Sequence, residues 1–145
     1  ARDNNEATIL WMGTMAGMTF TSGDYRVNGV ITVPASSYIT FDCRGDIEAK
    51  ISIHSVGAIT LGAGANIILL NGCTSQNIQW TSEAAITLGA GVVFEGSAYA
   101  LGAVDAAAAD SVSGGLYSMA AVSVGHIKTL FPNAEDVWQA PSFRF

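Results

Sequence analysis

The sequence predicts an all-β solenoid, a fold in which short coils of chain stack on one another. The strongest sign is an exact internal repeat, because the residues of 58–64, AITLGAG, return unchanged at 85–91. A weaker period of 18 residues follows, in which 85–102 overlays 103–120 and apolar, small and aromatic positions largely coincide. A unit of this length is too short to fold alone, and it suits one coil that pairs with the next.

From Thr19 to Gly125 the sequence has the composition of β-strands. Short runs rich in Ile, Val, Thr and aromatic residues alternate with Gly, Asn, Ser and Asp, which favour turns. A two-sheet sandwich would also give short strands, but it would not explain the 18-residue register. The offset between Ala58 and Ala85 is 27 residues, and we interpret it as one coil with an extra loop around residues 72–81.

Residues 1–18 differ from the rest of the chain and predict a short N-terminal helix. The asparagines at positions 4–5 are good helix caps, and apolar side chains recur at helical spacing between Ile9 and Met15. Trp11 lies beside them in the sequence. We expect this apolar face to pack against the solenoid.

Residues 126–145 form a third segment, which contains two of the three prolines and several aromatic residues. This aromatic C-terminal tail either caps the last coil or docks on a neighbouring molecule. Capping is preferred, because open solenoid ends are exposed sheet edges that need cover. We therefore expect a helical segment at 1–18, a solenoid at 19–125 and a cap or docking tail at 126–145. The residues expected to cap the solenoid or to join subunits are Trp11, Met15, Phe131, Trp138, Phe143 and Phe145.

The composition indicates one soluble domain that neither binds nucleic acid nor inserts into a membrane. Half of the 145 residues are hydrophobic (50%), which is enough for a core, whereas only 12% are charged. The net charge is −6 and the basic residues are scattered, so the basic patch that phosphate binding needs is missing. The most apolar stretch, residues 56–72, is shorter than a membrane-spanning helix.

The two cysteines, Cys43 and Cys73, have neither the spacing of a metal site nor the number needed for a disulfide framework. A single bridge would form if neighbouring coils brought them together. Two buried free thiols are the alternative, since free cysteine is often buried. The sequence leaves both alternatives open.

The densest polar cluster lies at residues 42–50, where acidic and basic side chains alternate. If this segment is extended, Asp42 and Asp46 share one face, as a paired-carboxylate glycosidase would need. A solvated turn with weakly paired charges is preferred. His54 and His126 have no neighbour at metal-ligand spacing, and no phosphate loop or nucleophile elbow is found. We expect neither catalysis nor a cofactor.

Four segments together resemble the microbial ice-binding-protein family. Residues 19–25 (TFTSGDY) are similar to the family's "T-x-T-x-G-x-Y", and residues 39–46 (ITFDCRGD) to its "L-T-L-D-x-x-G-D". Residues 68–80 (ILLNGCTSQNIQW) resemble "V-x-L-x-N-G-x-x-x-x-N-V-x-W", and residues 85–96 (AITLGAGVVFEG) resemble "A-T-L-G-x-G-x-x-F-x-G". The resemblance spans residues 19–125, and its order and spacing are specific.

That family folds as an irregular, right-handed, three-faced β-solenoid with one helix lying along it. The resemblance therefore implies an irregular right-handed β-solenoid (β-helix), a secreted, extracellular protein, and no catalytic residue. Many members adsorb to ice through a flat face, and others are adhesive modules (adhesins) of larger surface proteins. The family's usual N-terminal coil has no counterpart in residues 1–18, and the surface motif "T-A/G-x-T/N" is not clearly present.

The partner that this resemblance implies is ice or another ordered surface. Threonine methyl and hydroxyl groups on stacked strands would give a rigid lattice that orders water. Thr60 and Thr87 occupy equivalent places in the exact repeat, and threonines such as Thr32 could extend their row. High β-propensity alone would also explain each threonine. The candidate residues of the surface-binding face are Thr19, Thr21, Thr40, Thr60 and Thr87.

A structural role is the alternative hypothesis. Solenoids could self-associate end to end into a filament or surface appendage, joined by residues 1–18 and the tail at 126–145. The missing N-terminal coil and the aromatic tail favour this hypothesis, whereas the family resemblance favours adsorption to ice.

Overall fold

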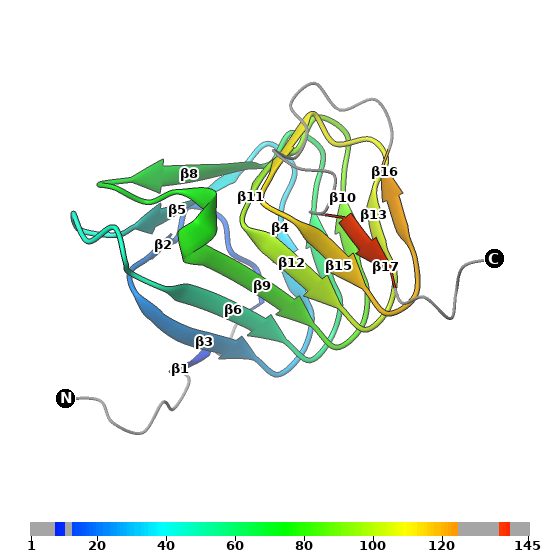
Figure 1. Ribbon diagram of the computed structural model, residues 1–145, viewed down its shortest axis with the longest axis horizontal. Coiled ribbons are helices and arrows are strands. Elements are labelled where there is room, and N and C mark those ends of the chain that lie inside the picture. Colours follow the sequence, from blue (N-terminus) through cyan, green and yellow to red (C-terminus); the bar gives the residue numbers. More distant parts are fainter. Residues whose placement is uncertain (1–7, 11–12, 125–136, 140–145) are drawn as a thin grey trace.

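The computed structural model describes residues 8–10, 13–124 and the backbone of residues 137–139. The chain winds through three parallel β-sheets, here called sheets A, B and C, which enclose one hydrophobic interior (Figure 1). Successive coils add one strand to each sheet, so neighbouring strands in a sheet come from successive coils. The prediction of an all-β solenoid is confirmed.

In each sheet the strands lie side by side in order from the first coil to the last. Sheet A contains β1 (Thr8–Leu10), β3 (Gly23–Val27), β6 (Ile51–Ser55), β9 (Ile78–Ser82), β12 (Ser97–Ala100), β15 (Leu116–Ser118) and β17 (Val137–Gln139). Sheet B contains β4 (Ile31–Val33), β7 (Ile59–Leu61), β10 (Ile86–Leu88), β13 (Val104–Ala106) and β16 (Val122–Val124). Sheet C contains β2 (Thr19–Phe20), β5 (Tyr38–Asp42), β8 (Asn66–Leu70), β11 (Val93–Glu95) and β14 (Ser111–Ser113).

The sequence repeats stack in register. In the exact repeat, Thr60 of β7 lies opposite Thr87 of β10. In the 18-residue period, Phe94 lies opposite Val112, and Tyr99 lies opposite Tyr117. Like residues therefore meet at these positions, which is why the repeat is visible in the sequence.

The 27-residue coil does contain an extra loop, but it is shorter than predicted. The loop occupies residues 71–77 and includes a one-turn 3₁₀ helix, η1 (Ser75–Asn77). Residues 78–81, also assigned to the loop from the sequence, lie in β9. They form a strand because Ile78 and Trp80 are buried against the interior and pair with β6.

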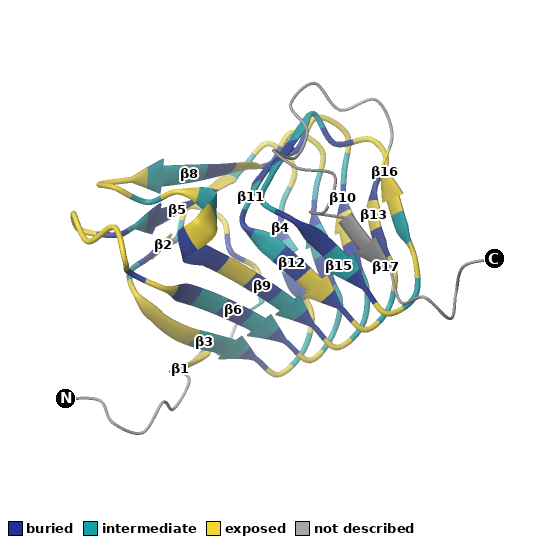
Figure 2. Ribbon diagram, viewed as in Figure 1, coloured by how far each residue is buried: buried dark blue, intermediate teal, exposed yellow. Residues whose placement is uncertain are grey.

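Side chains at equivalent inward positions change in size from coil to coil. On sheet A the inward position is Ile53 in β6, Trp80 in β9 and Ala98 in β12. Burial in Figure 2 alternates along the strands, with buried residues facing inward. Aromatic rings link three coils, since the Trp80 ring lies 5.7 Å (centroid to centroid) from the rings of both Phe41 and Phe94.

The predicted N-terminal helix is wrong where the structure describes it. Thr8–Leu10 forms β1, an edge strand that pairs with Tyr25–Val27. Thr14 makes a parallel bridge to Thr32, and the described residues contain no α-helix. The edge of β3 offers unpaired backbone groups that a strand can satisfy, and this tertiary pairing overrides the helical spacing of the apolar residues.

Buried serines fix the corner between sheets A and B. The Ser55 hydroxyl contacts the carbonyl oxygens of Gly29 and Gly57 at 2.6 and 2.8 Å. One coil later, Ser82 donates to the same Gly57 carbonyl at 2.9 Å. Ser118 repeats the contact with the Gly102 carbonyl at 2.7 Å. The hydroxyls give the carbonyls of these half-buried turn glycines a hydrogen-bond partner.

Cys43 and Cys73 form a disulfide with a Cα–Cα distance of 5.2 Å. The bridge joins the ends of β5 and β8, where the Cys43 N–H also donates to the Leu70 carbonyl. Of the two alternatives left open by the sequence, the structure contains the bridge. Within the described residues, no helix is both long and apolar enough to cross a membrane.

Candidate functional site

The outer face of sheet B presents a row of polar residues along the solenoid axis. In β4, β7, β10 and β13 the first and last residues are buried, and the middle residue faces outward. Parallel pairing places these middle residues opposite one another from coil to coil. The row consists of Thr14, Thr32, Thr60, Thr87, Asp105 and Ser123, and we call it the threonine row.

The threonine row is regular because the sheet imposes its spacing. Neighbouring strands of a sheet lie about 4.8 Å apart, so the side chains repeat at that interval. Threonine is branched at Cβ and its rotamers are restricted, which keeps methyl and hydroxyl groups in fixed places. The ladder of paired backbones beneath holds the row rigid.

Small residues flank the threonine row at Thr60 and Thr87, whereas Val30, which is 53% exposed, and Pro34 flank Thr32. On one side, successive carbonyls of Ala58, Ala85, Ala103 and Ala121 accept hydrogen bonds from the adjacent coil, which aligns these alanines in a column. On the other side lie Gly62 and Gly89. A Cβ on Gly62 would lie 2.7 Å from the Ala35 nitrogen of the neighbouring coil, so the close approach of the coils requires glycine.

The row changes character along the axis. Thr32, Thr60 and Thr87 are uncharged, and the next position is Asp105. One Asp105 carboxylate oxygen accepts a hydrogen bond from the Ala107 N–H at 3.0 Å. The uncharged part of the face therefore spans the earlier coils, and a carboxylate interrupts it.

The structure separates the threonines that the sequence grouped together. Thr60 and Thr87 lie in the threonine row, whereas Thr19 and Thr40 pair with each other on sheet C. Thr40 is only 7% exposed. Thr21 lies in the turn between β2 and β3, where its carbonyl accepts a hydrogen bond from the Tyr25 hydroxyl at 2.9 Å. These three residues are not on the face formed by Thr60 and Thr87.

Sequence reasoning missed Thr14 entirely. The residue lies in the segment assigned to a helix, yet it bridges to Thr32 and adds a position to the row. The available signal was the spacing of Gly13-Thr14-Met15, which repeats the small–Thr–apolar order found at Ala58–Leu61 with one residue fewer. Only the pairing with β4 makes that order meaningful.

The charged cluster at 42–50 is a pair of turns, so its side chains do not share one extended face. An Asp42 oxygen accepts from the Asn71 side chain at 2.9 Å and from the Arg44 N–H at 2.8 Å. The Asn71 bond, with the Arg44 bond, lowers the pKa of Asp42 below its ordinary value. An Asp46 oxygen accepts from the Glu48 N–H at 2.9 Å. These carboxylates shape the turns, and the condition set for a paired-carboxylate site is not met.

The polar residues of segment 68–80 are structural. Asn71 has a positive φ of 53° and reaches Asp42 across the coils. The Asn77 side chain is buried and donates to the carbonyls of Ile47 and Ala49 at 2.9 and 2.7 Å. The Trp80 ring nitrogen donates to the Glu95 carbonyl at 3.1 Å. The segment's polar atoms thus hold loops and coils together.

Two further observations concern ionisable groups. Burial raises the pKa of Glu95, which follows Phe94 on β11 and faces outward on sheet C. Among the residues that the structure describes, no group of three or more His, Cys, Asp or Glu side chains could hold a metal ion.

Of the residues expected to cap the solenoid or join subunits, the structure places two. Met15 is fully buried in the interior, and its N–H donates to the Thr32 carbonyl. The backbone of Trp138 lies in β17, opposite Tyr117. The other expected positions, Trp11, Phe131, Phe143 and Phe145, lie outside the described residues, as does His126.

Two bacterial relatives of this chain are named as ice-binding proteins. The chain is 28% identical over 116 residues to "Ice-binding protein 1" of Shewanella frigidimarina, which covers 79% of this chain and 13% of that protein. It is 26% identical over 123 residues to "Ice-binding protein" of Flavobacterium frigoris, which covers 85% of this chain and 43% of that protein. The chain therefore spans less than half the length of either relative.

Solved structures share the fold. An ice-binding protein from an Antarctic biological consortium superposes with a TM-score of 0.67 at 21% identity, over 97% of this chain and 56% of that chain. The ice-binding protein of an Arctic yeast superposes with a TM-score of 0.59 at 23% identity, over 88% and 48% of the two chains. A family model described as Ice-binding-like matches residues 1–129. The chain belongs to the Ice-binding-like family.

Proposed function

We propose that this protein adsorbs to ice through the outer face of sheet B, with the threonine row as the contact. The observation that supports the proposal most directly is the in-register alignment of Thr32, Thr60 and Thr87, with alanine and glycine on either side of Thr60 and Thr87. Ice is the proposed ligand because the relatives of this chain are named ice-binding proteins. No catalytic residue or cofactor is part of the proposal.

The physical basis is the match between a rigid protein lattice and an ordered solid. A water-ordering surface must hold its groups at fixed intervals, because any mobility would cost ordering entropy on adsorption. Parallel pairing fixes the interval along the axis, and the packed interior prevents the face from bending. Small flanking residues leave Thr60 and Thr87 open to a flat ice surface.

A substitution on the face and a matched one off the face test the proposal. Thr87→Arg places a long charged side chain in the middle of the row, at an exposed position. Thr19→Arg makes the same change at an exposed position on sheet C. We expect Thr87→Arg to abolish ice-crystal shaping and inhibition of recrystallisation, and Thr19→Arg to leave both intact. Equal loss in both variants, or activity retained in Thr87→Arg, would overturn the assignment of the face.

A gain-of-function variant sharpens the test. Asp105→Thr would extend the uncharged row by one coil. Loss of the Asp105 carboxylate removes only the hydrogen bond that it accepts from the Ala107 N–H. We expect stronger inhibition of recrystallisation at equal protein concentration. A variant that folds like the parent but shows unchanged or weaker inhibition would argue against the row as the contact.

The proposal includes secretion as an extracellular, adhesin-like module. The Cys43–Cys73 disulfide supports it, because disulfides persist mainly in oxidising compartments.

Self-association into filaments stays a prediction. Sedimentation across a range of concentrations, run beside the ice assay, measures it separately from adsorption.

A further inference from the structure

Two Asn-Gly pairs occur in the chain, at Asn28-Gly29 and at Asn71-Gly72. In such a pair the backbone nitrogen of the glycine can attack the side-chain amide of the asparagine. Glycine favours the attack because it has no Cβ to obstruct the approach and its backbone rotates freely. Both asparagines are exposed to solvent. Sequence and exposure therefore do not separate the two pairs, and the contacts around them decide which one reacts.

The peptide plane between Asn28 and Gly29 lies between two hydrogen-bonded neighbours. The Val56 N–H donates to the Val27 carbonyl at 3.1 Å, and the Gly57 N–H donates to the Gly29 carbonyl at 2.8 Å. Among the described residues, neither the Asn28 carbonyl nor the Gly29 N–H has a backbone partner. A Cβ on Gly29 would meet nothing within 4 Å, so the space around this residue is open. The plane can therefore rotate towards the Asn28 side chain while the flanking carbonyls stay bonded.

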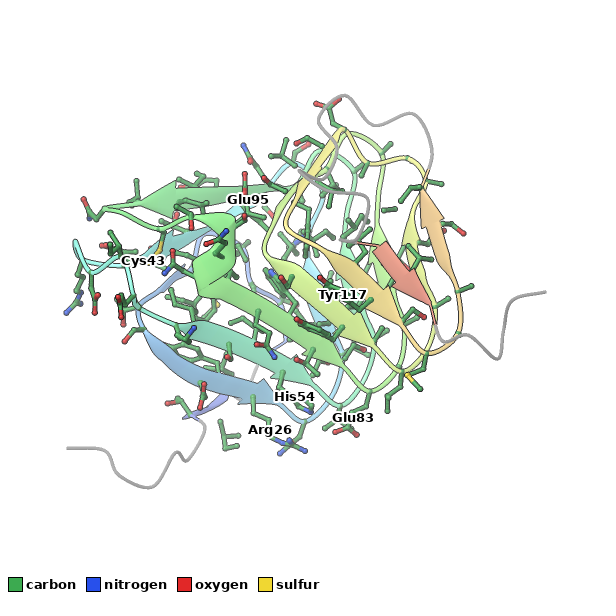
Figure 3. All side chains as sticks on the ribbon, in the orientation of Figure 1. Arg26, Cys43, His54, Glu83, Glu95 and Tyr117 are labelled. Carbon is green, nitrogen blue, oxygen red and sulfur yellow. A yellow bond between two sulfur atoms is a disulfide. The ribbon has the colours of Figure 1, made fainter. Side chains whose placement is uncertain are left out.

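Arg26 polarises the carbonyl group that is attacked. Arg26 Nε donates to Asn28 Oδ1 at 2.8 Å, which orients the amide and draws electrons away from Cγ. Negative charge develops on this oxygen as the Gly29 nitrogen adds, and a guanidinium beside it stabilises that charge. Arg26 is labelled in Figure 3 and lies near the end of β3, just before the corner.

The Asn71-Gly72 pair has the opposite surroundings. The Asn71 carbonyl belongs to the peptide plane that would have to rotate, and it accepts from the Gly45 N–H at 2.8 Å. The Asn71 side-chain nitrogen donates to an Asp42 oxygen at 2.9 Å, so the charge beside this amide is negative. The next residue, Cys73, is joined by the disulfide to Cys43, which Figure 3 labels. A carboxylate opposes negative charge on the amide oxygen, and the bonds on either side restrain the loop.

We propose that Asn28 is a site of spontaneous deamidation through a succinimide, and that the fold protects Asn71 from the same reaction. The Gly29 nitrogen forms a bond to Asn28 Cγ and gives up its proton, while Nδ2 leaves as ammonia. Water then opens the cyclic imide at either of its carbonyls. Opening at one carbonyl gives aspartate, and opening at the other gives isoaspartate, in which the main chain runs through the former side chain. This inference does not depend on ice adsorption.

Isoaspartate would change the corner that leads into sheet B. It adds a methylene to the main chain between Val27 and Gly29, whose carbonyls are bonded to the next coil. β4, which carries Thr32 of the threonine row, begins at Ile31, shortly after this corner. The extra length strains the hydrogen bonds on either side, whereas aspartate adds only a charge beside Arg26. We therefore expect isoaspartate to lower Tm more than aspartate does.

Peptide mapping by mass spectrometry tests both sites in one sample. The folded protein is kept at mildly alkaline pH in ¹⁸O-labelled water, and aliquots are reduced, unfolded and cut after Lys and Arg. Arg44 and Lys50 lie between the two asparagines, so each asparagine is read in a separate peptide. Heavy oxygen at residue 28 marks hydrolysis of the imide, and electron-transfer fragmentation distinguishes isoaspartate from aspartate. The reduced chain in urea, incubated in the same way, is the unfolded reference.

We expect the folded protein to lose the Asn28 amide at least about tenfold faster than the Asn71 amide, a ratio equal to about 1.4 kcal/mol. In the unfolded reference the two should react at similar rates, because both are followed by glycine. The aged folded protein should contain isoaspartate at residue 28. Its Tm should be lower than that of Asn28→Asp, which has the same charge without the longer main chain.

Three variants separate the reaction from folding. Gly29→Ala obstructs the attacking nitrogen, and its Cβ meets no other atom within 4 Å, so it should suppress the reaction at the parental Tm. Arg26→Met removes the donor to Asn28 Oδ1 and should slow the reaction about fivefold, which corresponds to about 1 kcal/mol. Lys50→Met, at another exposed position, is the matched control for loss of a positive charge and should react as the parent does.

Faster loss of Asn28 than of Asn71 in the folded protein, with similar rates in the unfolded reference, supports the proposal. It is overturned by equal rates in the folded protein, by faster loss of Asn71, or by an intact Asn28 while the unfolded reference reacts. A rate that Gly29→Ala leaves unchanged also overturns it. A rate that Arg26→Met leaves unchanged, or that Lys50→Met lowers as much, overturns the role given to Arg26.

Discussion

Removing the disulfide should lower stability by an amount that follows from the length of the coil it closes. Cys43 and Cys73 are 30 residues apart and join the ends of two adjacent strands of sheet C. Closing a loop of that length removes unfolded-state entropy worth about 3.6 kcal/mol at 25 °C. For a chain of 145 residues, unfolding entropy is about 300 cal/mol/K, so the expected fall in Tm is about 12 °C.

The perturbation is made in two independent ways. Cys43→Ala/Cys73→Ala removes the bridge genetically, and dithiothreitol removes it chemically from the parent protein. Thermal unfolding followed by circular dichroism measures Tm in each case. The two should agree, and dithiothreitol should have no further effect on the double variant, which is the control for the reductant.

A small effect would refute the loop-entropy reasoning. If both treatments lower Tm by less than about 3 °C while the reduced parent titrates two free thiols, the bridge does not constrain the unfolded chain as argued. If the double variant falls much further than the reduced parent, the loss of sulfur atoms from the interior, where Cys43 is 2% exposed, dominates instead.

Three other substitutions each alter one residue whose surroundings determine whether stability or a pKa rises or falls. Gly114→Ala should lower the free energy of unfolding, measured in urea, by at least about 3 kcal/mol. The backbone φ of Gly114 is +118°, and a Cβ there would overlap the Gly96 carbonyl oxygen. A variant as stable as the parent would contradict this. Asn71→Gly tolerates the positive φ but removes the hydrogen bond to Asp42. The pKa of Asp42, followed by carboxyl NMR, should therefore rise towards its ordinary value of 3.8. An unchanged titration would show that the Asn71 hydrogen bond does not lower this pKa. The pKa of Glu95 is raised in the folded state, so unfolding is unaffected below its ordinary value of 4.5 and becomes easier as pH rises through the raised pKa. Glu95→Gln should remove this loss of stability, and an identical pH profile would show that another group causes it.

The sequence predicted the coil architecture because the fold repeats. Equivalent residues such as Ile86 and Val104 stack directly, so the requirement for an apolar residue recurs at the same interval in the chain. The same logic placed Thr60 and Thr87 opposite each other. The family resemblance in residues 19–125 added the three-faced arrangement, which a repeat length alone does not specify.

Local patterns were less reliable where a residue's neighbour lies far away in sequence. Spacing predicted a helix near Ile9, yet β1 pairs with β3, because an exposed strand edge satisfies the backbone more effectively than a short isolated helix. Thr14 entered the threonine row for the same reason.

The sequence by itself therefore determined that this chain is an all-β solenoid with stacked repeats, and that threonines recur within them. Only the tertiary structure decided which threonines share a face, because sheet membership separates Thr60 from Thr40 although both lie on strands. It also decided that Cys43 and Cys73 meet, since adjacency of two coils fixes that distance. The physical reason is that repeats encode contacts along the axis, whereas turns between sheets decide the face to which each residue points.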